Sequence, residues 1–218
     1  MLLLVLFIPR CGYSQSVTPN KPLCADTGSV RHIFVVVPAF NVTCDTTFHP
    51  LTTHEKFGEW LEGSYDPLGL GWEAFLSATV EYSNRDGFCG YGKGWGGYGK
   101  CLGATELEAN VSSFLGDYAL PSLMHQDPRY FRLGHGALGT RVLYAVSRVF
   151  ITHSDNGHWV FSSAALSGSA ISAGLSNLYF PQQDRGFGRS VNRAAIDLGN
   201  TALYNLAAEF WPDIKGVF

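Results

Sequence analysis

Apolar residues first recur with helical spacing in the segment TTHEKFGEWLEG. Phe57, Trp60 and Leu61 are three or four positions apart in it and would therefore share one face of a helix. Thr52 and Glu55 have the spacing of a capping box, in which the two side chains bind the first free backbone N–H groups of a helix. The pattern predicts a helix that begins directly after Thr52.

A glycine-rich segment interrupts this helical pattern. A second helix is expected to begin at Asp66 and Pro67, and residues 87–103 then read GFCGYGKGWGGYGKCLG. So many glycines predict a loop or a set of tight turns instead of a helix. The aromatic residues Tyr91 and Trp95 within it are weak candidates for ligand binding.

Part of the same segment, GWGGYGKC, nearly matches the phosphate-binding pattern G-x-x-x-x-G-K-[ST]. Cys101 stands where the pattern needs a hydroxyl for magnesium, and no apolar strand precedes it. Nucleotide binding is therefore not expected.

Three segments rich in small residues follow. Residues 115–123 (LGDYALPSL) and 198–206 (LGNTALYNL) are identical at five of nine positions, and residues 174–178 (GLSNL) resemble the end of both. We interpret them as one helical unit used three times, each ended by a proline, although chance similarity stays open because no fixed period links them. The three prolines are Pro128, Pro181 and Pro212.

The middle unit belongs to a stretch without charges, residues 156–183. Ala164, Gly168 and Ser172 recur in it every four residues, a spacing that lets helix backbones approach closely. The stretch is rich in serine and poor in leucine, so a buried helix, a membrane-inserted helix and an interfacial helix all stay open.

Two further segments carry an amphipathic or mixed pattern. Residues 193–214 have an apolar stripe beside a polar one and predict an amphipathic helix closed by Pro212. Residues 136–163 predict a helix to about Val149 and then a turn at Asp155–Gly157; the alternative is a hairpin that pairs VFIT with HWVF across that turn. The apolar stripe of the last segment contains Ile196, Gly199, Leu203, Leu206 and Phe210, and the polar one Asp197, Thr201, Asn205 and Glu209.

These patterns predict a mainly α fold: a bundle of Gly/Ala/Ser-rich helices with an extended N-terminal leader and a glycine-rich loop. Residues 1–14 would be a signal peptide, 15–50 an extended leader anchored by a disulfide, and 51–218 a single helical domain. An outer-membrane β-barrel is the alternative, suggested by the terminal Phe218 and the glycine and aromatic content. The helical segments lack the alternation that barrel strands need.

The N-terminus and the cysteines indicate export. An apolar run, Leu2–Ile8, precedes Gly12 and Ser14 in a cleavage-like arrangement, although no basic residue comes before it and a buried strand is the alternative. We therefore expect the periplasm or the outer membrane of a bacterial envelope. Four cysteines would then remain in a compartment that permits disulfides, and their order suggests two pairs. The pairs are Cys24 with Cys44 and Cys89 with Cys101.

The densest group of chemically active side chains lies in PSLMHQDPRYFRLG, residues 121–134. Asp127 precedes a proline, which predicts that its carboxylate caps the short turn PRYFR. Arg129 and Arg132 would pair with acids or helix-end carbonyls, or grip an anionic ligand. His125 with Asp127 and Arg129 is a weak candidate site, and a capping and packing motif is the stronger interpretation.

A second polar cluster contains His153, Ser154, Asp155 and His158. These residues could coordinate a metal or form part of an acid and base pair, although turns attract such residues in any case. No metal or cofactor is expected, because the sequence has no zinc-protease or EF-hand pattern and no C-x-x-C. The net charge of −3 gives no support for nucleic-acid binding.

Several short motifs support a resemblance over residues 51–214, about three quarters of the chain. In order they are EKF, YDPLG, GYGKGWGGYGK, PSLMHQDPRYFRLG, SRVFIT, GLSNLYFP followed by Asp184 and Arg185, and EFWPDI. The chain resembles a family of exported bacterial envelope proteins with an L-x-H-x-DPRYFR-type motif and no established activity. Cys89 and Cys101 around the glycines are a departure from that family.

The resemblance implies an exported, envelope-associated structural or interaction protein. Its partners would be membrane or envelope components, or a second copy bound through the small-residue helix faces. The alternative is a hydrolase acting on an envelope lipid or glycan, with His125 and Asp127 as acid and base. That alternative requires His153, or Asp184 with Arg185, to lie near His125.

Overall fold

The computed structural model describes residues 32–33, 37–38, 41–43, 48–67, 70–71, 74 and 88–215. The chain is mainly helical, which confirms the predicted fold class. The α-helices that lie wholly within these residues are α1 (Thr53–Ser64), α3 (Trp95–Ser113), α4 (Leu120–Met124), α5 (Leu138–Ser147), α6 (Ser163–Leu175) and α7 (Phe187–Lys215). A π-helical turn, η2 (Phe114–Ala119), joins α3 to α4, and three short 3-10 helices are η1 (Phe88–Gly90), η3 (Ser176–Leu178) and η4 (Gln182–Asp184).

The strands are short and form three small sheets. They are β1 (His32–Ile33), β2 (Val37–Pro38), β3 (Val42–Thr43), β4 (Gln126–Asp127), β5 (Tyr130–Phe131), β6 (Ile151–Ser154) and β7 (Trp159–Phe161). β1 pairs with β2, β3 lies parallel to β5, and β4–β6–β7 form an antiparallel sheet. The helix α5 and the hairpin β6–β7, which the sequence offered as alternatives, therefore both exist.

The start of α1 confirms the predicted capping box. The Thr52 hydroxyl accepts a hydrogen bond from the backbone N–H of Glu55 at 3.3 Å, and the Glu55 carboxylate accepts one from the N–H of Thr52 at 2.8 Å. The helix expected from Asp66 falls mostly outside the described residues, as do the signal peptide, most of the leader and the pair Cys24–Cys44.

The prediction of a loop throughout residues 87–103 is wrong for its second half. Residues 88–94 do form a 3-10 turn and bends, with positive φ at Gly90, Gly92 and Gly94, but α3 begins at Trp95 and includes three glycines in its first turns. A disulfide between Cys89 and Cys101 ties this helix to the preceding turn. Removing chain entropy in this way offsets the helix-destabilising effect of glycine.

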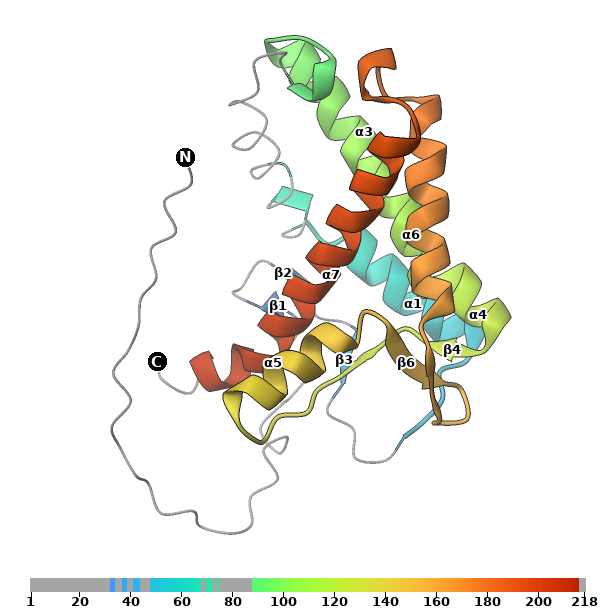
Figure 1. Cartoon of the computed structure of the whole chain (residues 1–218), viewed down its shortest axis with the longest axis vertical. Helices are drawn as coiled ribbons and strands as arrows, with labels where there is room; N and C mark the ends of the chain where they lie inside the picture. The colour runs from blue at the N-terminus through green and yellow to red at the C-terminus, as the bar shows by residue number, and fades with distance from the viewer. Residues whose placement is uncertain are drawn as a thin grey trace.

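The small residues of α6 allow its close packing, as their spacing predicted. α6 packs against α3, η2 and α7, and Ala164, Gly168 and Ser172 are buried (Figure 1). A Cβ at Gly168 would lie 2.7 Å from the backbone nitrogen of Gly116 in η2. This small-residue face is thus used within the chain, and the predicted homo-oligomer stays a prediction. Within the described residues, none of the helices has the length and apolarity needed to cross a membrane.

In helix α7, some polar residues face inward and some apolar residues face solvent, opposite to the usual amphipathic pattern. Asn205 and Glu209 of its polar stripe are buried and Thr201 is exposed. Of the apolar stripe, Ile196 and Leu203 are 55% and 65% exposed, whereas Leu206 packs against the core. The helix also continues through Pro212 to Lys215, so the prediction that this proline closes it is wrong. Pro212 lies in the last turn, where its missing N–H removes a single helical hydrogen bond.

The molecule has two distinct ends (Figure 1). At one end, which we call the hairpin end, lie β4, β6, β7 and α5. At the other, which we call the disulfide end, lie η1, the start of α3, η4 and the start of α7. Because α6 connects the two ends and has 13 residues, they are separated by about 20 Å.

Candidate functional site

The turn around Asp127 has the capping structure that the sequence predicted. The Asp127 carboxylate is fully buried and accepts a hydrogen bond from the backbone N–H of Arg129 at 3.0 Å. Both of its oxygens also accept hydrogen bonds from the guanidinium of Arg129, from Nε at 3.0 Å and from Nη2 at 2.6 Å. The carboxylate is therefore engaged in an ion pair and a turn, which leaves it little capacity to act as a base.

The residues after this turn are held by Glu209, which the sequence did not nominate. Its buried carboxylate accepts hydrogen bonds from the hydroxyl of Tyr130 at 2.9 Å and from the backbone N–H groups of Leu133 and Gly134 at 2.9 and 2.8 Å. Arg141 of α5 adds an ion pair through Nε at 2.8 Å. The motifs DPRYFRLG and EFWPDI thus bind each other.

Two other residues of the motif also have structural roles. Gln126 bridges the hairpin to α6, because its Nε2 donates to the carbonyl of Phe161 at 2.8 Å and its Oε1 accepts from the N–H of Ala164 at 3.0 Å. Arg132 is buried, and its backbone N–H donates to the carbonyl of Thr43 on β3 at 3.1 Å.

His125 lies apart from Asp127, although only one residue separates them. It has a left-handed backbone, with φ of 54°, and its side chain is 82% exposed. Its Nδ1 is 3.6 Å from Oδ2 of Asp155, and the other oxygen of Asp155 accepts a hydrogen bond from the buried Lys56 at 2.7 Å. The structure therefore places Asp155 between a buried lysine and an exposed histidine.

His153, a further residue of the predicted polar cluster, also lies near this motif. It lies opposite Asp127 in the β4–β6 ladder, and its ring packs against Phe131 and Trp159, with centroids 4.4 and 3.6 Å away. Burial lowers the pKa of His153 from its usual 6.5, and the nearby Asp127 opposes that change. His153 is thus brought beside Asp127, but within an aromatic layer.

The remaining predicted residues lie at the disulfide end. Tyr91 donates to the carbonyl of Tyr179 at 2.7 Å, and Arg185 donates to the carbonyl of Phe180 at 2.5 Å. Asp184 lies 3.7 Å from Arg189, and Trp95 is exposed. About 20 Å of α6 separates this group from His125.

A polar cavity of about 350 Å³ lies between α1, α3, η2 and α7. A smaller one of about 200 Å³ adjoins it and shares several lining residues, including Asp117, Asp197 and Tyr204. The larger cavity has four carboxyl side chains in its wall, and none of its described lining residues is Lys, Arg or His. The four acids are Glu59, Glu106, Asp117 and Asp197.

The π-helical turn η2 explains how Asp117 reaches this cavity. Gly116 packs against α6, where Ala165 and Gly168 leave room for its backbone, and the next residue, Asp117, faces the cavity on the other side. π-Helical turns are rare and occur frequently at functional sites. The turn thus serves close helix packing and the cavity at the same time.

The carboxyl groups of the cavity have altered acidity. Burial, reinforced by the neighbouring carboxylate of Asp197, raises the pKa of Asp117 from 3.8 to about 7. Burial also raises the pKa of Glu59 from 4.5 to about 7, although the charge of Arg129 opposes that change. Asp197 instead accepts a hydrogen bond from the hydroxyl of Ser112 at 2.8 Å. Acids with such pKa values outside ion pairs are typical of functional sites.

Three buried acceptor atoms of the cavity residues have no hydrogen-bond partner among the residues that the structure describes: Oε2 of Glu59, Oε2 of Glu106 and Oδ1 of Asn110. Trp60 and Tyr204 provide aromatic surface in the same wall. Among the residues that the structure describes, no group of three or more His, Cys, Asp or Glu side chains has the geometry to hold a metal ion.

No protein-family model, curated protein or solved structure matches this chain. The resemblance to exported envelope proteins therefore stays a prediction. The acids of the cavity were missed in the sequence because each stands alone on its own helix, without a local motif around it.

Proposed function

We propose that this chain is an exported, envelope-associated binding protein that holds a small organic cation in the acidic cavity. The observation that carries the proposal is the set of partnerless buried acceptors on Glu59, Glu106 and Asn110. Leaving a buried acceptor unsatisfied costs about 1–3 kcal/mol, more where the group is charged. A ligand with several N–H donors would remove that cost at all three atoms.

The shape and composition of the cavity favour an amine or a guanidinium. Its volume of about 350 Å³ suits a molecule of a few carbon atoms with a donor at each end. Four carboxyl groups supply the negative charge, and Trp60 and Tyr204 supply faces on which a cation or its methylene chain can pack.

The alternative of a hydrolase with His125 and Asp127 as acid and base has less support. A general base needs a free lone pair within reach of the substrate. Both oxygens of Asp127 are bonded to Arg129, and His125 faces Asp155 at the exposed surface. Of the two groups either of which could complete this site, Asp184 with Arg185 lies at the opposite end of α6, and the ring of His153 packs against Phe131 and Trp159.

Isothermal titration calorimetry tests the proposal with the folded chain at pH 8. We expect 1,4-diaminobutane or butylguanidine to bind, and the neutral analogue 1,4-butanediol to bind at least tenfold more weakly. Glu59→Gln should weaken cation binding by about 10- to 100-fold, the range for a hydrogen bond to a charged group. Glu62→Gln is the matched control, because Glu62 is an exposed glutamate on α1 that does not line the cavity.

Two results would contradict the proposal. The first is that neither cation binds to a chain whose circular dichroism shows the expected helices. The second is that Glu59→Gln and Asp197→Asn bind the cations as tightly as the unmodified chain. If one substitution unfolds the chain, the other still provides the test.

A further inference from the structure

The disulfide end presents the two most exposed large apolar side chains of the described residues. Trp95, the first residue of α3, is 88% exposed, and Phe187, the first residue of α7, is 87% exposed. Both lie on segments that contact each other at this end, since Gln183 donates to the carbonyl of Gly90 at 3.1 Å. Neither aromatic ring is needed for the core, so their exposure requires another explanation.

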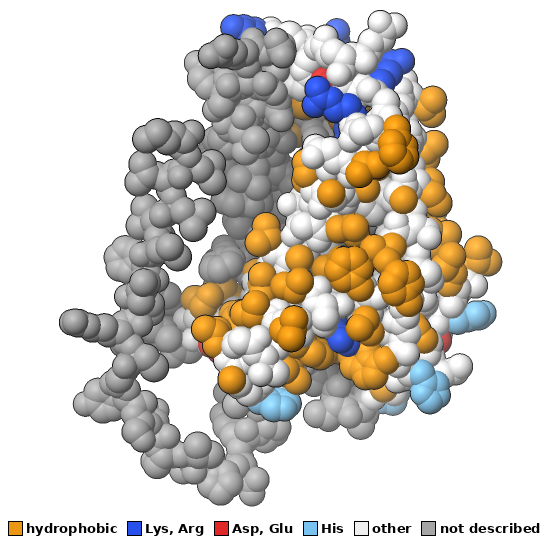
Figure 2. Space-filling model, in the orientation of Figure 1, with side chains coloured by type: hydrophobic (Ala, Val, Ile, Leu, Met, Phe, Trp, Pro, Cys, Tyr) orange, Lys and Arg blue, Asp and Glu red, His pale blue; other side chains and the backbone are white. Residues whose placement is uncertain are grey.

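The same end is basic, although the whole chain has a net charge of −3. Lys93, Lys100, Arg185 and Arg189 are exposed and lie within five positions of Trp95 or Phe187 in the sequence, and Asp184 is the single acid in residues 88–100 and 179–192. Figure 2 shows Lys and Arg side chains gathered at this end, with apolar side chains along the flank below. The local excess is therefore three positive charges.

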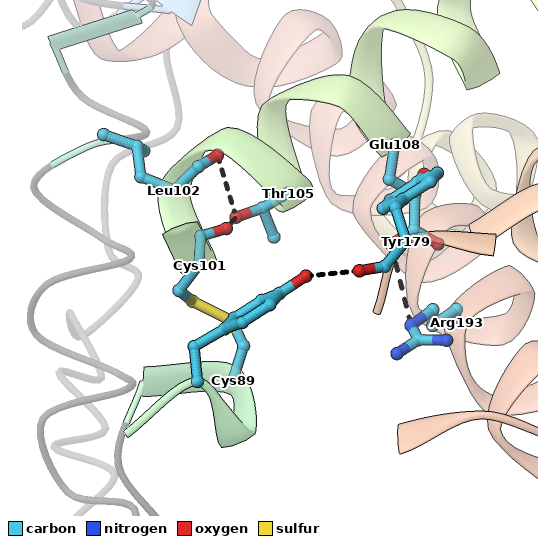
Figure 3. Close-up of a disulfide and its surroundings, with 8 residues drawn as sticks. Cys89, Cys101, Leu102, Thr105, Glu108, Tyr179 and Arg193 are labelled. Atoms are coloured by element: carbon cyan, nitrogen blue, oxygen red, sulfur yellow. Dashed lines mark hydrogen bonds and ion pairs between the residues drawn. A yellow bond between two sulfur atoms is a disulfide. The ribbon is translucent and has the colours of Figure 1, made fainter. Parts of the chain in front are cut away.

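This end is also held in a fixed shape. The Cys89–Cys101 disulfide closes the glycine-rich turn (Figure 3). The carbonyl of Tyr179 accepts a hydrogen bond from the hydroxyl of Tyr91 at 2.7 Å. Arg193 of α7 lies 3.7 Å from Glu108 of α3, which links the two helices just behind (Figure 3). The exposed groups thus stand on two braced helices, so little entropy is lost when they are bound.

We propose that the disulfide end docks on an anionic lipid bilayer surface. Trp95 and Phe187 would enter the interfacial region, where aromatic rings are favoured, and the four basic side chains would lie against lipid phosphates. A combination of basic charge with protruding aromatic rings is typical of interfacial membrane binding. The proposal is independent of cation binding in the cavity, whose lining includes none of these residues.

Cosedimentation with vesicles tests the proposal on the full-length, oxidised chain. We expect binding to vesicles of phosphatidylcholine and phosphatidylglycerol in a 3:1 ratio, and much weaker binding to phosphatidylcholine alone. Lys93→Ala with Lys100→Ala should weaken binding by about thirtyfold, taking about fivefold for each basic residue near the surface. Trp95→Ser with Phe187→Ser should weaken it by at least about tenfold, because two apolar rings are lost.

The controls are Leu143→Ser and Leu203→Ser, which remove side chains that are 71% and 65% exposed on the flanks of α5 and α7. Their binding should equal that of the unmodified chain. The proposal is overturned if the flank variants lose binding and the disulfide-end variants keep it. It is also overturned if the anionic vesicles bind none of the chains, or if all variants bind equally through the apolar run Leu2–Ile8. Sedimentation without lipid tests whether the chain instead self-associates through this end. If Trp95→Ser abolishes such self-association, a second copy, and not a bilayer, occupies the disulfide end.

Discussion

Replacing Asp117 with asparagine should stabilise the folded chain at pH 8. Its carboxyl group faces the cavity beside Asp197, and burial raises its pKa from 3.8 to about 7. The folded state therefore binds a proton more tightly than the unfolded state does. As pH rises from about 4 to about 7, the unfolded chain loses this proton first, so the free energy of unfolding falls over that range.

The size of the effect follows from the same pKa values. A difference of about three pH units corresponds to about 4 kcal/mol as an upper limit, at 1.36 kcal/mol for each unit. Water in the cavity would screen part of this cost, so we expect Asp117→Asn to gain about 1–3 kcal/mol at pH 8. The gain should shrink on acidification and vanish below about pH 3, where the aspartate is mostly protonated in both states.

Urea denaturation followed by circular dichroism at pH 8, 6 and 4.5 measures this directly, with Glu62→Gln as an exposed control on α1. A gain that is largest at pH 8, smaller at pH 6 and smallest at pH 4.5 is the expected result. If Asp117→Asn instead lowers the free energy of unfolding at pH 8, the carboxylate is a stabilising ionised group and the reasoning about the cavity is wrong.

Three further predictions concern packing, the buried ion pair and the cavity. Gly168→Ala should destabilise the fold by about 1–3 kcal/mol, because its Cβ would meet the backbone of η2. Gly174→Ala on the same helix has open space around its Cβ and should be neutral or slightly stabilising. Thermal denaturation of the two variants measures the difference. Glu209→Ala should cost about 3–5 kcal/mol in a urea titration, since it leaves the guanidinium of Arg141 buried without its main partner; a loss below 1 kcal/mol would contradict that role. Cation affinity should fall as pH drops below about 7, because Glu59 must lose its proton to bind, and calorimetry at pH 8 and 5.5 that gives equal affinities would contradict it.

Local signals in the sequence were sufficient where the interaction itself is local. The capping box joins residues three apart, the Asp127 cap joins residues two apart, and the disulfide spans 12 positions. Small-residue spacing in α6 also predicted its close packing against another helix, because only small side chains permit the close approach to η2. Each of these features could be inferred without knowing the rest of the fold.

The contacts that organise the interior are not local. Glu209 meets Arg141 from 68 positions away and Leu133 from 76 positions away, so no window of sequence contains the pair. Hydrophobic periodicity then misleads, since it assumes that the apolar stripe of α7 faces the core. Ile196 and Leu203 of that stripe face outward, while Glu209 is buried on the inward side of the same helix and binds α5 and the DPRYFRLG segment.

Two acids of the cavity, Glu59 and Asp117, differ from other enclosed acids in having no ion-pair partner in the described part of the chain. Elsewhere in the described chain, three enclosed acids have cationic partners: Asp127 pairs with Arg129, Glu209 with Arg141, and Asp155 with Lys56. Glu59 and Asp117 form no such ion pair in the described part of the chain, and both have a pKa of about 7.

Ionising Glu59 and Asp117 is therefore unfavourable, because neither acid has the cationic partner that Asp127, Glu209 and Asp155 have. A bound cation would remove that cost and would lower both pKa values. Ligand binding at pH 7 should therefore release protons, which calorimetry in buffers of different ionisation enthalpy would detect.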